Sequence, residues 1–100
     1  MDIDNLYEGI KPLAEQLQQL YKQAYVLYKP EVDHLIKAQI KDENTIQHLL
    51  DGLLDFCADS QVLLLFKKLC RYYWDINPVA TADYVNFYRE MWDSESLPAR

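Results

Sequence analysis

Apolar residues at alternating steps of three and four constrain the fold of this chain more than any other feature. The pattern is unbroken from residue 3 to residue 27 and comprises Ile3, Leu6, Ile10, Leu13, Leu17, Leu20, Ala24 and Leu27. This spacing gathers the side chains on one face of an α-helix, in a seam along which the helix packs against a neighbour. The first quarter of the chain is therefore predicted to be helical.

Two prolines are predicted to divide this helical segment. Pro12 falls on the polar side of the seam, and a proline inside a helix removes a hydrogen bond and kinks or breaks it. The sequence predicts a short helix, a kink, and a long helix over 12–28 with Pro12 in its first turn. Because the residue before a proline avoids the helical conformation, Lys29 is the expected break, and Pro30 starts a second helix that ends near residue 40.

The next helix follows a polar loop at 41–44, with Asn44 or Thr45 as its expected cap. It has a single apolar face, made of Ile46, Leu49, Leu50, Leu53, Leu54 and Cys57. A further helix over about 61–75 is apolar around most of its circumference, which predicts that it is the central helix of the fold.

The ends of the last two helices carry recognisable signals. Asp59 or Ser60 is expected to cap the helix over 61–75, and Asn77 with Pro78 to end it. Thr81 is expected to cap the final helix.

Turn-forming residues are scarce, since the 100 residues include only two glycines and four prolines, and half of the residues are apolar. An all-β fold needs many more turns. The sequence therefore predicts an all-α, up-and-down bundle of four main helices with a short or kinked N-terminal helix. We expect one domain over 1–95, followed by a frayed tail over 96–100.

The charge and the cysteines limit the classes of partner and the compartment. A net charge of −6 repels the phosphate backbone, so nucleic-acid binding is not expected. The longest apolar run, 62–66, is too short to cross a membrane, and the first residues do not have the pattern of a secretory signal. Cys57 and Cys70 do not form a C-x-x-C pair and fit a reduced, cytoplasmic protein.

No pattern in the chain indicates catalysis. His48, Asp51 and Asp55 share the polar face of one helix, but no second histidine accompanies them, so neither a metal site nor another cofactor is expected. Both glycines are isolated, which excludes a phosphate-binding glycine loop. The sequence predicts a protein that is not an enzyme.

Aromatic residues give the strongest indication of a binding surface. Tyr72, Tyr73 and Trp74 are consecutive, so Tyr73 is expected to point inward and the other two to emerge on opposite flanks. Phe87 falls at the edge of the last helix. Such rings either wedge between helices or form an interface, where tyrosine and tryptophan are enriched.

Leu64 is of a different kind, because it lies within the polar arc of its helix among Lys67, Lys68 and Arg71. If another helix covers that face, Leu64 belongs to the core. If no helix does, it is an apolar anchor with a basic rim.

Acidic residues concentrate between 75 and 95 and follow the outer face of the last helix. Aromatic anchors beside such a stripe fit a basic partner, which carboxylates attract over a distance. The candidate partner-binding residues are Leu64, Trp74, Asp75, Asp83, Asn86, Phe87, Glu90 and Asp93.

We therefore predict a small acidic protein-binding module, of the inhibitor, immunity or regulatory kind, that contacts a basic protein partner. One alternative is a structural homodimer that uses its aromatic flank as the interface. Another is a scaffold that resembles tetratricopeptide repeats, because helices that start near 46 and 80 are offset by 34 residues, the period of those repeats. The large residues Leu54, Phe66, Tyr73 and Tyr88 occupy the positions where those repeats need small ones, so no family is assigned.

Overall fold

The computed structural model describes the backbone of residues 3–92 and the side chains of residues 8–92. Over this range the chain forms four α-helices and no strand. They are α1 (Ile3–Lys37), α2 (Glu43–Leu54), α3 (Ser60–Trp74) and α4 (Pro78–Trp92). The all-α bundle of four main helices is confirmed. The expected tail over 96–100 lies outside the described residues.

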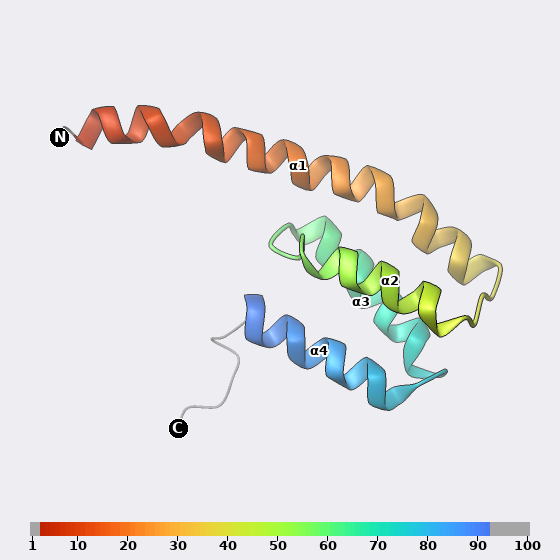
Figure 1. The fold of residues 1–100 in the computed structure, drawn as a ribbon. Helices are drawn as coiled ribbons and strands as arrows, with labels where there is room; N and C mark the ends of the chain where they lie inside the picture. Colours follow the sequence, from red (N-terminus) through yellow and green to blue (C-terminus); the bar gives the residue numbers. More distant parts are fainter. Residues whose placement is uncertain (1–2, 93–100) are drawn as a thin grey trace, which may run out of the picture.

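Helix α3 is the centre of the bundle, as its sequence predicted. It packs against α1, α2 and α4, whereas α1 and α2 share a smaller contact (Figure 1). The apolar face that the sequence predicted for α2 and the residues just after it is buried, from Ile46 to Cys57. Opposite it, α3 contributes buried side chains that include Tyr73, whose exposed fraction is 0%. The other buried residues of α3 are Val62, Leu65, Phe66, Leu69 and Cys70.

The predicted break at Lys29 is wrong, because α1 continues through both Pro12 and Pro30. Side chains on both sides of Pro30 are buried in the same bundle, including Ala24 before it and Val32 after it. The ammonium of Lys29 also donates to the Asp33 carboxylate at 2.7 Å and so bridges the proline turn. Packing thus outweighs the local preference against a helical residue before proline.

Helix α1 ends at Lys37, slightly before the predicted end near residue 40. The amide of Ile40 donates to the carbonyl of Leu35 at 3.0 Å, and Gln39 lies in the left-handed region with φ 55°. These two features are typical of a helix terminated by a left-handed residue. The Tyr72 hydroxyl of α3 donates to the Ile40 carbonyl at 2.7 Å, which holds this end of α1 against the bundle.

The N-terminus of α2 lies slightly before its predicted place, so the expected caps Asn44 and Thr45 are wrong. Asp42 is the cap, and its carboxylate accepts from the Thr45 amide at 3.2 Å and from the Thr45 hydroxyl at 2.6 Å. The early start places Glu43 in the first turn of α2. There its carboxylate accepts from the Tyr73 hydroxyl at 2.5 Å and from the side-chain amide of Asn77 at 2.7 Å. This tertiary contact is not visible in the local sequence.

One of the two remaining caps is as predicted. Asp59 caps α3 by accepting from the amides of Gln61 and Val62, both at 3.0 Å. Thr81 does not cap α4, which already begins at Pro78. The Asn77 side chain accepts from the Ala80 amide at 3.0 Å, and a proline in the first turn has no amide hydrogen to satisfy. Thr81 instead lies within α4, and its side chain is buried.

The first part of α1 extends beyond the bundle as an arm. Figure 1 shows its N-terminal half running past the ends of the other helices. The described chain measures 54 × 39 × 17 Å, with a radius of gyration of 16.5 Å, against about 13 Å for a compact domain of this length. Of the described seam residues only Ala24 is buried in the bundle, since Leu27 is 62% exposed. The exposed fractions of Ile10, Leu13, Leu17 and Leu20 lie between 50% and 60%.

Candidate partner-binding site

A groove between α3 and α4 is the most developed concave surface that involves the predicted residues. It consists of two adjoining hollows of about 270 Å³ and 420 Å³, which share Cys70 and Val85. We call the two hollows together the α3–α4 groove. Its lining residues are Leu63, Phe66, Lys67, Cys70, Arg71, Trp74, Asp75, Thr81, Val85, Tyr88 and Arg89.

Beside Trp74 the groove is open because the nearby part of α4 carries small side chains. The first two turns of α4 supply the small residues Ala80 and Thr81 near the end of α3. Tyr84, the next large inward residue, reaches α2 instead, where its hydroxyl donates to Asp51 at 2.8 Å. Further along, Trp92 donates to the carbonyl of Leu54 at 2.7 Å. These two hydrogen bonds to α2 add to the main packing of α4 against α3, and space beside Trp74 stays open.

The floor of the groove is apolar and rigid. Phe66 and Cys70 are buried, and the Phe66 ring lies 6.0 Å from the Tyr88 ring, centroid to centroid. Leu63 and Val85 complete the apolar lining. An apolar floor set by buried side chains suits an apolar group of a partner.

The rim is basic, in contrast to the chain as a whole. Lys67 and Arg71 border the groove from α3 and Arg89 borders it from α4, with Asp75 as the single acid. All four are exposed. The net charge of the chain is nevertheless −6. The groove is therefore a locally basic surface on an acidic protein.

Trp74 stands at one end of this groove with an exposed fraction of 54%. Tyr73 is fully buried and Tyr72 half-buried, so the three consecutive rings point as their helical positions predicted. Asp75 lies next to Trp74 and also lines the groove. The structure therefore brings these two predicted site residues together.

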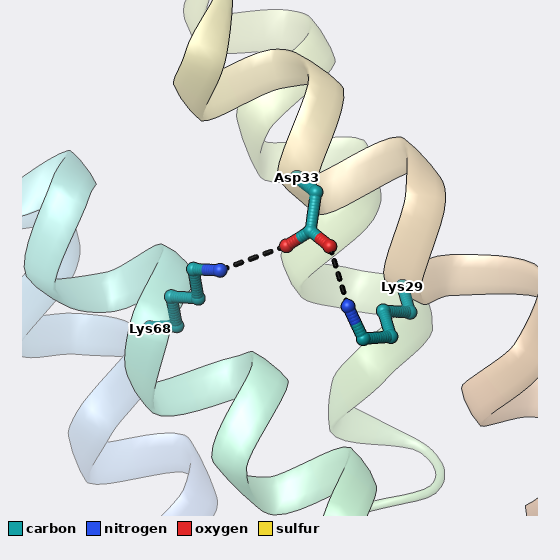
Figure 2. A network of polar contacts seen from close by, with 3 residues as sticks. All are labelled: Lys29, Asp33 and Lys68. Carbon is teal, nitrogen blue, oxygen red and sulfur yellow. Dashed lines mark hydrogen bonds and ion pairs between the residues drawn. The ribbon is translucent and has the colours of Figure 1, made fainter.

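Leu64 does not line the α3–α4 groove. Its exposed fraction is 65%, so no described helix covers it, and it lines a separate hollow beside α1. There Asp33 accepts from Lys68 at 2.8 Å and from Lys29 at 2.7 Å (Figure 2). These hydrogen bonds, from Lys29 first and then Lys68, lower the pKa of the Asp33 carboxyl.

The remaining predicted residues occupy the outside of α4. Asp83, Asn86 and Glu90 are exposed there. Phe87 has an exposed fraction of 47% and meets the Tyr84 ring edge-on at 5.9 Å between centroids. Asp93 lies outside the described residues. The predicted site is thus spread over three surfaces: the α3–α4 groove, the hollow beside Leu64 and the outer face of α4.

The sequence analysis placed Lys67 and Arg71 around Leu64 and not in a groove. The groove residues that it did not propose as a site are Leu63, Phe66, Cys70, Thr81, Val85, Tyr88 and Arg89. Lys67, Arg71 and Trp74 follow one another at steps of four and three along α3, and this spacing could have marked a common face. Arg89 and Val85 could not have been added, because their place opposite α3 depends on how α4 docks.

Neither cysteine has the surroundings of a nucleophile. Cys57 and Cys70 are free and buried, and burial raises the pKa of both thiols to about 12. A thiol with such a pKa forms almost no thiolate at neutral pH. Among the described residues, no group of three or more His, Cys, Asp or Glu side chains could hold a metal ion.

Comparisons with protein-family models, curated proteins and solved structures find no match. Within residues 3–92, no helix combines the length and the apolar character needed to span a membrane.

Proposed function

We propose that this protein is a protein-binding module that acts by contact and not by catalysis, and that its α3–α4 groove receives an apolar segment of a partner. The observation that carries the proposal is the combination of an apolar floor, a basic rim and the exposed ring of Trp74. Large apolar and aromatic side chains on a rigid surface supply most of the binding energy of an interface. The buried free thiols fit a reducing compartment, so we place the module in the cytoplasm.

The charge of the rim identifies the segment that fits best. Lys67, Arg71 and Arg89 favour carboxylates on the partner, next to the apolar side chain that enters the groove. A short amphipathic helix meets both requirements, since its apolar residues recur at three and four positions and acids can occupy the intervening ones. We therefore propose an acidic amphipathic segment as the ligand of the groove.

The outer face of α4 supports a second candidate, the basic partner expected from the sequence. Asp83 and Glu90 are exposed there and form no ion pair with any other described residue. Phe87 borders them and would supply an apolar contact. On this proposal the carboxylates steer a basic partner and accelerate association.

A pair of matched peptides distinguishes the two candidates. Both carry the same leucine and phenylalanine anchors at helical spacing, and one has glutamates and the other lysines at the intervening positions. We expect the glutamate peptide to bind more tightly in a fluorescence-anisotropy titration. Lys67→Glu with Arg71→Glu should weaken binding of the glutamate peptide at least about tenfold and should not weaken that of the lysine peptide.

Lys11→Glu with Lys22→Glu is the matched control, because it changes the net charge equally on α1, which makes no substantial contact with α4. Affinity for the glutamate peptide should be almost unchanged in this control. Tighter binding of the lysine peptide, reduced by Asp83→Lys with Glu90→Lys, would instead support the outer face of α4. Absence of binding by both peptides at millimolar concentration would overturn both candidates.

A further inference from the structure

The exposed seam of α1 has the heptad pattern of a two-stranded coiled coil. We define the N-terminal seam as Ile3, Leu6, Ile10, Leu13, Leu17 and Leu20. Counted as heptads, Ile3, Ile10 and Leu17 occupy the a positions, and the three other leucines occupy the d positions. β-Branched residues at a with leucine at d favour two parallel strands.

The bundle does not cover the seam over its described side chains, from Ile10 to Leu20. Ile10, Leu13, Leu17 and Leu20 have exposed fractions of 52%, 60%, 50% and 50%. The bundle meets α1 from Tyr21 onward, where the Tyr21 ring lies edge-on to Phe56 at 6.2 Å between centroids. Ala24, where the seam reaches the bundle, is buried. The uninterrupted exposed part of the seam therefore ends at Leu20, and beyond Ala24 only Leu27 of the seam is exposed again, at 62%.

The uncharged residues flanking the seam are compatible with a second copy of the chain as its occupant. The e and g positions beside the described seam residues are Gly9, Ala14, Gln16 and Tyr21, and none is charged. Two identical helices can therefore approach without repulsion between like charges. The charged residues of the arm, Glu8, Lys11, Glu15 and Lys22, all occupy b or f positions, on the side away from the partner.

Pro12 is compatible with this arrangement. It occupies a c position, so its ring lies outside the seam, and α1 remains helical through it. The paired stretch of about eighteen residues is about 27 Å long at 1.5 Å per residue. A contact of this length falls at the small end of specific interfaces, so the test of pairing covers the micromolar range.

We propose that the N-terminal seam pairs two copies of this protein as a parallel coiled-coil dimer. The dimer presents two α3–α4 grooves at the same end of the paired arms. The seam and the groove are separate surfaces, so the dimer does not depend on the proposed ligand of the groove.

Sedimentation equilibrium of the full chain between about 5 and 500 µM tests the pairing, because this range brackets a micromolar dissociation constant. We expect the native chain to shift from monomer to dimer over this range. Leu13→Asp with Leu17→Asp should keep the protein monomeric throughout, with circular dichroism confirming a folded bundle. The matched control, Gln18→Asp with Gln19→Asp, adds the same charges at b and c positions and should still dimerise. A native chain that stays monomeric, or a control and seam variant that behave alike, would overturn the proposal.

A cysteine at position 17 tests the parallel direction. In a parallel pair the two copies of residue 17 face each other, so Leu17→Cys should form an intermolecular disulfide under mild oxidation. In an antiparallel pair residue 17 lies opposite residue 6, and the disulfide should not form. The two native thiols are buried and should not contribute to cross-linking. A native dimer whose Leu17→Cys variant does not cross-link would contradict the parallel arrangement.

Discussion

At the scale of single residues, Gly52 marks the closest approach of α1 to α2. It lies inside α2, and a Cβ atom added there would overlap the hydroxyl and ring of Tyr28 from α1. Its φ is not positive, so the backbone itself accepts alanine. The glycine therefore serves the contact between helices and not a turn.

We expect Gly52→Ala to leave the free energy of unfolding unchanged or lower it, because displacement of the Tyr28 ring offsets the better helix propensity of alanine. In a Tyr28→Ala background the same substitution should stabilise the protein by about 1 kcal/mol, the intrinsic difference between glycine and alanine. Urea denaturation of the four proteins measures the coupling. An equal effect of Gly52→Ala in both backgrounds would show that the two residues do not meet.

The hydrogen bond of Asp51 is a long-range contact that could not be predicted from the sequence alone. The helical position of Asp51 correctly placed it outside the apolar face of α2. The hydrogen bond that it accepts from Tyr84 joins residues 33 positions apart, and only the docking of α4 brings them together. Burial raises the pKa of the Tyr84 hydroxyl, and the Asp51 carboxylate raises it further.

At the scale of helices, the continuity of α1 makes a prediction about Pro30. Inside a helix a proline removes one hydrogen bond and costs about 3 kcal/mol, whereas in a first turn it is favourable. Because α1 runs through this position, we expect Pro30→Ala to raise the free energy of unfolding by about 2 kcal/mol, after allowance for the more flexible unfolded chain. Chemical denaturation monitored by circular dichroism measures the change.

Pro12→Ala is the comparison for this experiment. Pro12 lies in the exposed arm, so alanine there should increase helicity but change the unfolding midpoint of the bundle less than Pro30→Ala does. A lower stability of Pro30→Ala would mean that the chain breaks at Lys29, as its sequence alone suggested.

The helices themselves could be predicted because periodicity is local. The apolar face from Ile46 to Cys57 and the inward turn of Tyr73 follow from a step of 100° per residue. The errors arose where distant contacts decide: packing on both sides of Pro30 keeps α1 intact, and Glu43 joins α2 to the end of α3. For the same reason the groove could not be predicted, since Arg89 meets the basic face of α3 only after α4 has docked.

At the scale of the whole molecule, two carboxylates tie the helices together. Glu43 of α2 accepts from Tyr73 of α3 and from Asn77 in the connection to α4. Asp33 of α1 accepts from Lys68 of α3 and from Lys29. Hydrogen bonds from Tyr73 and then Asn77 lower the pKa of Glu43, as those from Lys29 and Lys68 lower the pKa of Asp33.

The lowered pKa values of Asp33 and Glu43 make the free energy of unfolding depend on pH in the acid range. A carboxyl whose pKa is lower in the folded state than in the unfolded chain stabilises the fold above its unfolded value of about 4. This contribution is lost as the pH falls through the folded pKa. We therefore expect the free energy of unfolding to decrease below about pH 5, and both Glu43→Gln and Asp33→Asn to make that decrease shallower. Urea denaturation at a series of pH values measures it.

High salt should separate the contribution of Asp33 to stability from that of Glu43. The partners of Asp33 are charged and about half exposed, with side-chain exposed fractions of 49% for Lys29 and 52% for Lys68, so at about 1 M NaCl their effect is screened. The partners of Glu43 are a hydroxyl and an amide, which salt does not screen in this way. In high salt, Asp33→Asn should therefore have little effect on the decrease in the free energy of unfolding at acid pH. Glu43→Gln should still make that decrease shallower. If the flattening by Glu43→Gln also disappears in salt, the hydrogen bonds from Tyr73 and Asn77 do not hold its pKa down, and the junction of α2, α3 and α4 does not depend on this carboxylate.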